Sequence, residues 1–323
     1  MKALGIQRFM PLLAALALAC GGGAVTPPGG DTAPVTPAVY APGNTYFGAS
    51  NYVEYVAGNL PVVFSAPHGG ALTPAEIPDR TAAACGGEAT TGRDLNTAEL
   101  ARAVQAAFFE RTGRYPHVVI AHLHRRKLDA NRPLAEAACG NTAAGKAFAE
   151  YHEFIEVAKA RILADHGKGW YTDLHGHGHP IQRLELGYLL ESDDLRLSDE
   201  TLDASVAYEN ESSIKVFSQQ LPMSFSALLR GPASLGTLLA TAGYPSVPGG
   251  QDTHPDTTEA YLSGGYSTER HGCSGGGAVC GVQIEHNMTN VRDTEASRAA
   301  YAAALTTVYE QYLAQFGIVL PRR

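Results

Sequence analysis

The chain has 323 residues, of which 45% are hydrophobic and 17% are charged. This balance is typical of a globular protein and not of a disordered one, and the length suffices for one large α/β domain or two small ones. The formal net charge is −8 and no segment is strongly basic, so nucleic-acid binding has little electrostatic support.

The first twenty residues have the pattern of an export signal. Lys2 and Arg8 supply positive charge, and the apolar run that follows, residues 9–19, is too short to span a bilayer as a stable helix. Cys20 comes after Leu-Ala-Leu-Ala, which resembles a bacterial lipoprotein signal, in which the cysteine is lipidated. We expect an exported protein anchored to a membrane of the bacterial envelope by this lipid. An ordinary cleaved signal of a secreted or periplasmic protein is the alternative.

The remainder divides into a tether and one domain. Residues 21–44 are rich in Gly, Pro and Thr and predict a flexible linker, and residues 45–323 predict a single catalytic domain.

The four cysteines of this domain suggest disulfides, because their number is even and the protein is predicted to be exported. Cys273 and Cys280 flank a short Gly-rich loop, which favours a local bridge. Cys85 and Cys139 would then form a long-range bridge.

Strands and helices alternate along the domain. Short apolar runs predict strands, and a 3.6-residue apolar period predicts helices, with Asn96 and Glu99 as a capping box at one helix start and Gly113 and Gly167 as helix ends. The predicted strands are 60–65, 117–123, 170–174 and 282–285, and the predicted helices are 97–111, 144–165 and 295–316. This alternation indicates an α/β fold with a mainly parallel sheet covered on both faces, whose ligands bind at the carboxyl ends of the strands.

Polar residues follow three of these strands. His68, His175 and Glu285 all fall at or just beyond strand ends, so they are expected to meet at one edge of the sheet. Two imidazoles suit a zinc ion, and the third ligand in hydrolytic zinc sites is commonly a carboxylate, for which Asp94 is placed before a helix. Asp173, two residues before His175, is a candidate to orient that histidine.

Two further histidines and one glutamate carry alternatives. His177 and His179 follow His175 in a Gly-rich stretch and are expected to be solvent-facing loop residues. Glu285 ends an apolar strand, where a carboxylate is costly unless it faces a polar site, so it is a candidate general base. A structural carboxylate with a paired charge is the alternative for Glu285.

Five stretches, in order, resemble the N-formylglutamate amidohydrolase family, which is related to zinc carboxypeptidases and to succinylglutamate desuccinylase and aspartoacylase. They are Ser65-Ala-Pro-His-Gly-Gly70, Gly92-Arg-Asp-Leu-Asn-Thr97, Leu128-Asp-Ala-Asn-Arg-Pro133, Asp173-Leu-His175, and Gly264-Gly-Tyr-Ser-Thr-Glu-Arg-His-Gly272 with Val282-Gln-Ile-Glu285.

The resemblance implies a three-layer α/β/α fold of the phosphorylase/hydrolase type, with a mainly parallel mixed sheet and one zinc ion per chain. It implies His68, Asp94 and His175 as metal ligands and Glu285 as the base. In the related carboxypeptidases the carboxylate ligand comes three residues after the first histidine, where this chain has Ala71, so Glu76 is kept in reserve for Asp94.

The resemblance also assigns substrate contacts. Asn131 and Arg132 are expected to hold a substrate carboxylate, because the planar guanidinium pairs with a carboxylate through two bonds. Arg270 is a second candidate for that task, and Arg125 or Arg126 is expected to help stabilise the oxyanion.

The sequence therefore predicts a zinc-dependent hydrolase that cleaves an amide bond in a small acidic N-acyl amino acid or peptide. An exported carboxypeptidase or an amidase of peptidoglycan peptides is the alternative within enzymes. From a different class, a surface-anchored binding protein with a degenerate metal site is also consistent with the sequence.

Overall fold

A computed structural model describes residues 40–323, which form one compact unit. The predicted export signal with Cys20, and most of the predicted linker, lie outside the described residues. The described chain starts at Tyr40, whose ring packs edge-on against the rings of Tyr46 and Tyr55. Every helix within residues 40–323 is too short or too polar to span a lipid bilayer.

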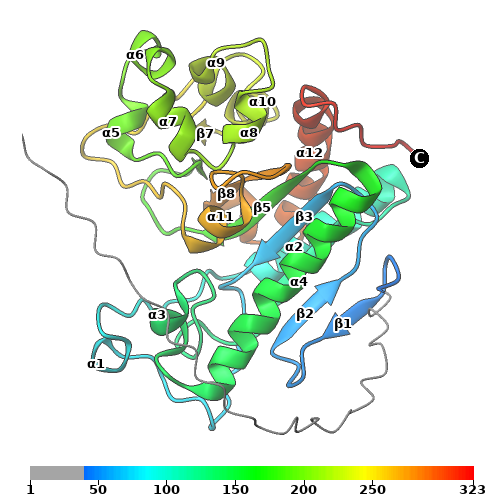
Figure 1. The fold of residues 1–323 in the computed structure, drawn as a ribbon, viewed down its shortest axis with the longest axis vertical. Coiled ribbons are helices and arrows are strands. Elements are labelled where there is room, and N and C mark those ends of the chain that lie inside the picture. The colour runs from blue at the N-terminus through cyan, green and yellow to red at the C-terminus, as the bar shows by residue number, and fades with distance from the viewer. Residues whose placement is uncertain (1–39) are drawn as a thin grey trace, which may run out of the picture. The chain divides into compact units, whose positions relative to one another are not determined.

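Eight strands form one mixed sheet in the order β1-β2-β4-β3-β5-β8-β6-β7 (Figure 1). The central strands β4, β3, β5 and β8 are parallel to one another. On one side β2 pairs antiparallel with β4, and β1 antiparallel with β2; on the other side β6 pairs antiparallel with β8 and parallel with β7. The strands are β1 Thr45–Phe47, β2 Val53–Val56, β3 Val62–Ala66, β4 His117–Ala121, β5 Gly169–Gly176, β6 Leu184–Gly187, β7 Ser246–Val247 and β8 Val279–His286.

Helices cover both faces of this sheet. The longer ones are α2 Thr97–Thr112, α4 Thr142–His166 and α12 Glu295–Ala314. Figure 1 shows α4 lying across the front of the sheet, where it packs on Val63. The neighbouring residue Phe64 points to the other face and packs on Phe108 of α2 and Tyr309 of α12. The molecule is therefore the predicted α/β fold in three layers.

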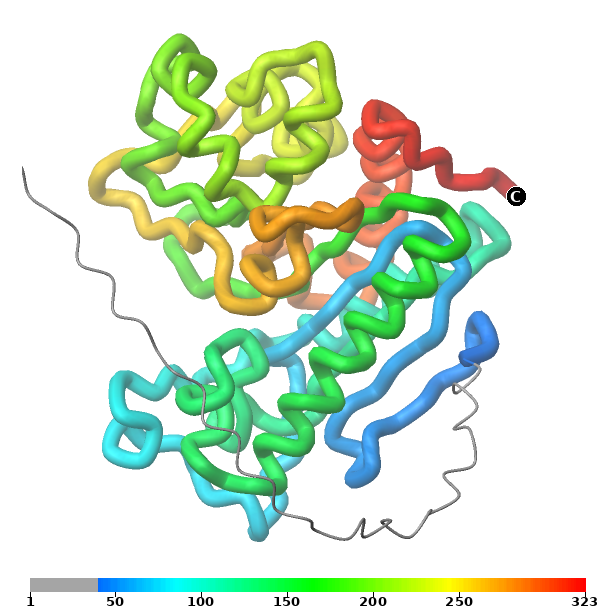
Figure 2. The backbone as a smooth tube through the Cα atoms, in the orientation of Figure 1, coloured from blue at the N-terminus to red at the C-terminus, as the bar shows by residue number. Residues whose placement is uncertain are grey.

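The remaining helices are short and lie mostly between β6 and β8. They are α1 Ala82–Cys85, α3 Leu134–Ala138, α5 Ser192–Leu195, α6 Asp199–Ala204, α7 Val206–Glu211, α8 Lys215–Ser218, α9 Phe225–Arg230, α10 Leu235–Thr241, α11 Tyr266–His271 and the turn η1 Met288–Arg292. In Figure 2 the yellow-green segment between β6 and α11 lies together at the top of the view.

The predicted strands and long helices are all present, with ends that differ by at most three residues. Gly113 and Gly167 end their helices, as predicted, and both adopt the left-handed conformation. The capping box at Asn96 is wrong: this residue has a left-handed backbone and makes no side-chain cap. Its side-chain amide donates instead to the carbonyl of Arg292 at 2.9 Å.

Both expected disulfides are present. Cys85 at the end of α1 is bonded to Cys139 after α3, across a sequence separation of 54 residues. Cys273 and Cys280 are bonded across the Gly-rich loop that leads into β8. Disulfides of this kind are typical of an oxidising compartment outside the cytoplasm.

The buried His117 at the start of β4 makes stability depend on pH. Its Nδ1 accepts hydrogen bonds from the backbone N–H of Gly58 at 3.1 Å and from the hydroxyl of Tyr55 at 2.8 Å. Burial, with a smaller contribution from the nearby Arg161, lowers the pKa of His117 to about 3. A histidine in the unfolded chain has a pKa of about 6.5, so between these two values the unfolded chain binds the extra proton.

We predict that the free energy of unfolding falls as the pH is lowered from about 6.5 toward 3, and that His117→Gln makes this fall shallower. The difference in slope should approach about 1.4 kcal/mol per pH unit, the value for one proton. Urea titrations at several pH values, with a chelator present throughout, measure it. His254→Gln, in the loop after β7, is the control and should leave the slope unchanged. Equal slopes for His117→Gln and the unsubstituted protein would contradict the prediction.

Candidate metal centre and active site

The carboxyl ends of β3, β5 and β8 bring together the residues that the sequence singles out. His68 lies two residues beyond β3, and His175 and Glu285 are register partners on β5 and β8. Asp94 reaches them from the segment before α2, where its backbone N–H donates to the His68 carbonyl at 3.1 Å. Gly69 permits this approach, because a side-chain carbon there would overlap the start of α2.

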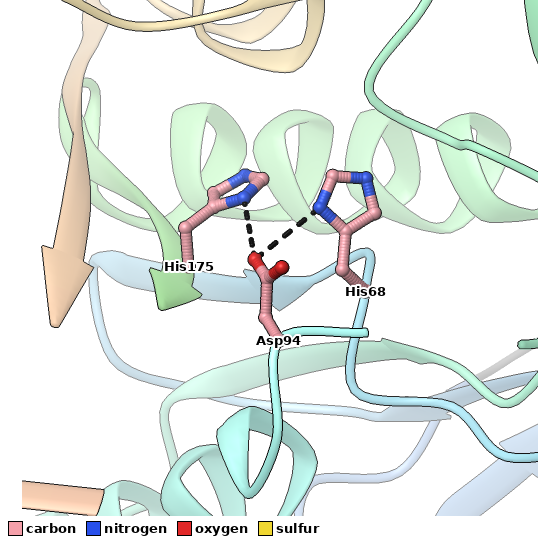
Figure 3. Close-up of side chains that lie close together, drawn as sticks. All are labelled: His68, Asp94 and His175. Atoms are coloured by element: carbon pink, nitrogen blue, oxygen red, sulfur yellow. Dashed lines mark hydrogen bonds and ion pairs between the residues drawn. The ribbon is translucent and has the colours of Figure 1, made fainter. Parts of the chain in front are cut away.

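Asp94 stands between the two histidines (Figure 3). Its Oδ2 lies 3.3 Å from Nδ1 of His68 and 3.1 Å from Nδ1 of His175. All three side chains are buried, and one possible ligand atom from each lies within 4.8 Å of the others. Two imidazoles and one carboxylate are a common ligand set for catalytic zinc. This cluster can hold a divalent metal ion.

The hydrogen-bond partner of Nε2 in each imidazole shows whether the ring is oriented for a metal ion. Nε2 of His68 lies 2.7 Å from Oδ1 of Asp129, and Nε2 of His175 lies 2.8 Å from Oδ2 of Asp173. A proton on Nε2 satisfies each of these contacts and leaves a lone pair on each Nδ1, on the side of Asp94. Metal-binding histidines are oriented in this way, by a carboxylate or carbonyl behind the ring. The residues present therefore fit a metal ion.

The two orienting carboxylates are themselves held. The hydroxyl of Ser65 donates to Asp173 at 2.5 Å, and Nε of Arg125 donates to Asp129 at 2.9 Å. The sequence pointed to Asp173 but not to Asp129. Asp129 lies within the stretch Leu128–Pro133 that carries the family resemblance, and that was the signal by which it could have been found.

The charges in the cluster depend on one another. Burial favours the neutral form of Asp94, but the adjacent His68 and His175 hold the pKa of its carboxyl well below its usual value. Burial also opposes protonation of His175, yet Asp173 and Asp94 raise the pKa of its imidazole well above its usual value. A metal ion would compete with a proton for Nδ1, so binding of the ion weakens as the pH falls.

Glu285 is placed beside the cluster as a candidate base. Its Oε1 lies 3.8 Å from Nδ1 of His175 and accepts a hydrogen bond from the Gln283 amide at 2.9 Å. Burial raises the pKa of Glu285 to about 8, with Asp94 and Glu185 adding to the effect of burial and His175 opposing it. A carboxylate in such a setting can take up a proton and return it near neutral pH.

These groups line a cavity of about 260 Å³ at the edge of the sheet. Arg125, Asn131 and Arg132 form part of its wall, and Leu262 forms another part. The side-chain amide of Asn131 also lies 3.3 Å from Nε2 of His175. Two guanidinium groups and one amide therefore face the same cavity as the His–Asp cluster, which makes it suited to an anionic ligand.

Arg125 and Arg126 lie in different places, although the sequence allowed either to stabilise the oxyanion. Arg125 lines the cavity, with Nη1 3.7 Å from Oδ1 of Asp94. Arg126 points away from it and lies 3.6 Å from a carboxylate oxygen of Asp79 at the surface. Both residues lie in the hydrogen-bonded turn that follows His124, and their side chains leave this turn in different directions.

Two other candidates also lie outside the wall of the cavity as formed by residues 40–323. Arg270, on α11, donates to the hydroxyl of Tyr266 at 3.1 Å and lines a separate surface hollow. Glu76 is exposed and accepts a hydrogen bond from the hydroxyl of Tyr52. Among the described residues, Glu76 is not part of the group formed by His68, Asp94 and His175, and Arg270 does not line their cavity.

The expectation for His177 is wrong, because its ring is buried and not solvent-facing. Its Nε2 donates to the carbonyl of Arg183 at 2.8 Å. His179 is about one quarter exposed and pairs with Glu185 of β6 at 2.8 Å. The chain turns back after β5 to enter β6, which brings both rings against the sheet.

Arg292 organises the site, and no motif pointed to it. This buried arginine donates through Nε to the carbonyl of His286 at 2.9 Å and through Nη2 to the carbonyl of His177 at 2.9 Å. Its Nη1 donates to the carbonyl of Leu95. Gly176 lies against the guanidinium, and a side-chain carbon there would overlap it.

Comparison with known proteins finds similar solved structures only: no protein-family model and no curated protein matches the chain. The chain is similar in structure to N-formylglutamate amidohydrolase from Ralstonia eutropha JMP134, with 13% identity and a TM-score of 0.48, over 82% of this chain and 98% of that one. It is also similar to a gene product of Agrobacterium tumefaciens, with 16% identity and a TM-score of 0.43, over 83% of this chain and 98% of that one. Because these identities and scores are low, the function proposed below rests on the geometry of the site.

Proposed function

We propose that the protein is a zinc-dependent hydrolase that cleaves an amide bond next to a carboxylate in a small N-acyl amino acid or peptide. The observation that carries the proposal is the convergence of two Nδ1 atoms, from His68 and His175, on one oxygen of Asp94. Buried carboxylates hold both rings from behind, and Glu285 stands beside them on the next strand.

His68, Asp94 and His175 would hold the zinc ion, which when bound acts as a Lewis acid toward a carbonyl oxygen and a water molecule. Glu285 takes the proton of the attacking water and later delivers it to the nitrogen of the leaving amine. The guanidinium of Arg125 lies beside Asp94 at the cavity wall, where it stabilises negative charge that develops on the carbonyl oxygen.

Asn131 and Arg132 select the substrate by its carboxylate. Arg132 donates one bond to the Asn131 carbonyl at 3.0 Å, which holds the side chain at the wall and leaves its other donors for a ligand. The cavity of about 260 Å³ suits a molecule of the size of an acylated amino acid and is small for a folded or long peptide.

We also propose that the protein acts outside the cytoplasm, attached by a lipid at Cys20. The two disulfides support an oxidising location. Acidic peptides and acylated amino acids released in the envelope are substrates of the proposed class.

We predict that His68→Ala and His175→Ala each lose one equivalent of zinc relative to the unsubstituted protein, together with hydrolysis. Each substitution removes one of three protein ligands, which a tetrahedral zinc site does not tolerate. Metal analysis of the purified protein after dialysis measures the zinc content. His166→Ala, at the exposed end of α4, is the control and should keep all the metal. Full zinc content in both cluster variants would refute the assignment.

We predict that Glu285→Gln lowers kcat by roughly 10²-fold or more while the zinc content stays unchanged. Glutamine keeps the shape of the side chain but cannot accept the proton. The measurement is the release of free amine from N-acyl amino acids and from muropeptides, alongside metal analysis. Loss of zinc would make Glu285 a ligand, and unchanged turnover would place the base elsewhere. A protein that binds these compounds without hydrolysing any of them would be the binding protein of the alternative reading.

We predict that Arg132→Ala raises KM for a substrate with a carboxylate, whereas Arg270→Ala leaves KM unchanged. Arg132 lines the cavity and Arg270 does not. Both substitutions remove one positive charge, so a difference between them reports the position of the arginine and not the change in net charge. A fall in kcat would accompany the rise in KM if the same contact orients the scissile bond. Steady-state kinetics measure both constants, and an equal effect of the two substitutions would contradict the role given to Arg132.

A further inference from the structure

A second group of possible metal ligands lies beyond the first, where the chain turns from β5 into β6. His177 and His179 come from the connecting segment and Glu185 from β6. One possible ligand atom from each lies within 4.8 Å of the others. None of these residues takes part in the hydrolysis proposed above.

His177 is oriented as a ligand. Its Nε2 can contact the Arg183 carbonyl at 2.8 Å only as a donor, because a carbonyl accepts. In the neutral ring the lone pair is then on Nδ1. It accepts a hydrogen bond from the backbone N–H of His179 at 3.1 Å, which a metal ion bound at Nδ1 would displace. A carbonyl behind the ring is one of the arrangements that orient metal-binding histidines.

Glu185 supplies a carboxylate in a setting where an isolated charge is costly. The residue is 1% exposed. Its Oε2 accepts a hydrogen bond from the backbone N–H of Leu262 at 2.9 Å, and its Oε1 lies 2.8 Å from Nδ1 of His179. One oxygen is thus held by the main chain, while the other faces the histidines. The ring of His179 is 25% exposed, which gives an ion a route from solvent.

We propose that His177, His179 and Glu185 form a second binding site for a divalent transition-metal ion of the zinc type. Two imidazoles and one carboxylate are nitrogen and oxygen ligands that suit zinc and its chemical neighbours. The ion replaces the proton that otherwise joins His179 to Glu185. It compensates the buried carboxylate and ties the β5–β6 connection to the sheet.

This ion has a structural task at the wall of the cavity. Glu185 holds the backbone of Leu262, and Leu262 lines the cavity. Glu185 is also the register partner of Glu285 across the β6–β8 pair. Fixing Glu185 therefore fixes one wall of the cavity and the strand next to the proposed base.

Zinc stoichiometry tests the proposal. The full-length protein, dialysed against a buffer of controlled free Zn²⁺, should hold about two zinc ions per chain. His179→Ala should hold about one, and so should His68→Ala, because each removes a ligand from a different site. His166→Ala, whose ring is exposed and belongs to neither site, should keep two. His179 is partly exposed, so this variant is not expected to unfold, and circular dichroism checks that it does not.

Cobalt gives a second readout that does not depend on activity. In the His68→Ala background, added Co²⁺ should produce the visible absorption of a protein-bound ion, and the additional change His179→Ala should abolish it. One zinc per chain in the unsubstituted protein, lost in His68→Ala, would overturn the second site and leave the proposed function intact. Two zinc ions retained in His179→Ala would overturn it as well. Loss of hydrolysis alone, with two ions bound, would count against the proposed function and not against this site.

Discussion

The guanidinium of Arg292 is the constraint on which the site depends. It donates to three backbone carbonyls, and each belongs to a segment that carries a site residue: Leu95 follows Asp94, His177 follows the β5 end, and His286 follows Glu285. Burial lowers the pKa of this arginine, and the neighbouring Asp94 and Glu285 act in the opposite direction. An uncompensated buried cation would be costly, so the negative charges of the site and this arginine stabilise one another.

The sequence predicted what depends on strand direction. His68, His175 and Glu285 could be placed together because parallel strands end at the same edge of a sheet, whatever lies between them in the chain. Local patterns were enough for these three, since each is positioned by the strand to which it is attached. Asp94 was named from its place before a helix together with the family resemblance, with Glu76 in reserve.

Side chains that are positioned by long-range contacts could not be placed from sequence patterns. Arg125 contacts Asp129 and Asp94, whereas Arg126 contacts Asp79, and the direction of a side chain in a turn leaves no periodic pattern in the sequence. Asn96 is a residue type common at helix caps. Its side-chain amide instead donates to the carbonyl of Arg292, nearly two hundred residues away in the chain. The burial of His177 follows from the return of the chain into β6. The short helices α5–α10 lack the length over which a 3.6-residue period can be recognised.

The disulfide between Cys85 and Cys139 constrains a segment that carries site residues. It closes a loop that contains Asp94, Asn131 and Arg132, so part of the cavity lining lies between its two cysteines. A closed loop of this length removes on the order of 4 kcal/mol of chain entropy from the unfolded state. In a reducing compartment the two cysteines would stay unbonded and the chain would lack this constraint. The stability of the segment that carries Asp94, Asn131 and Arg132 therefore depends on the redox state of the compartment in which the chain folds.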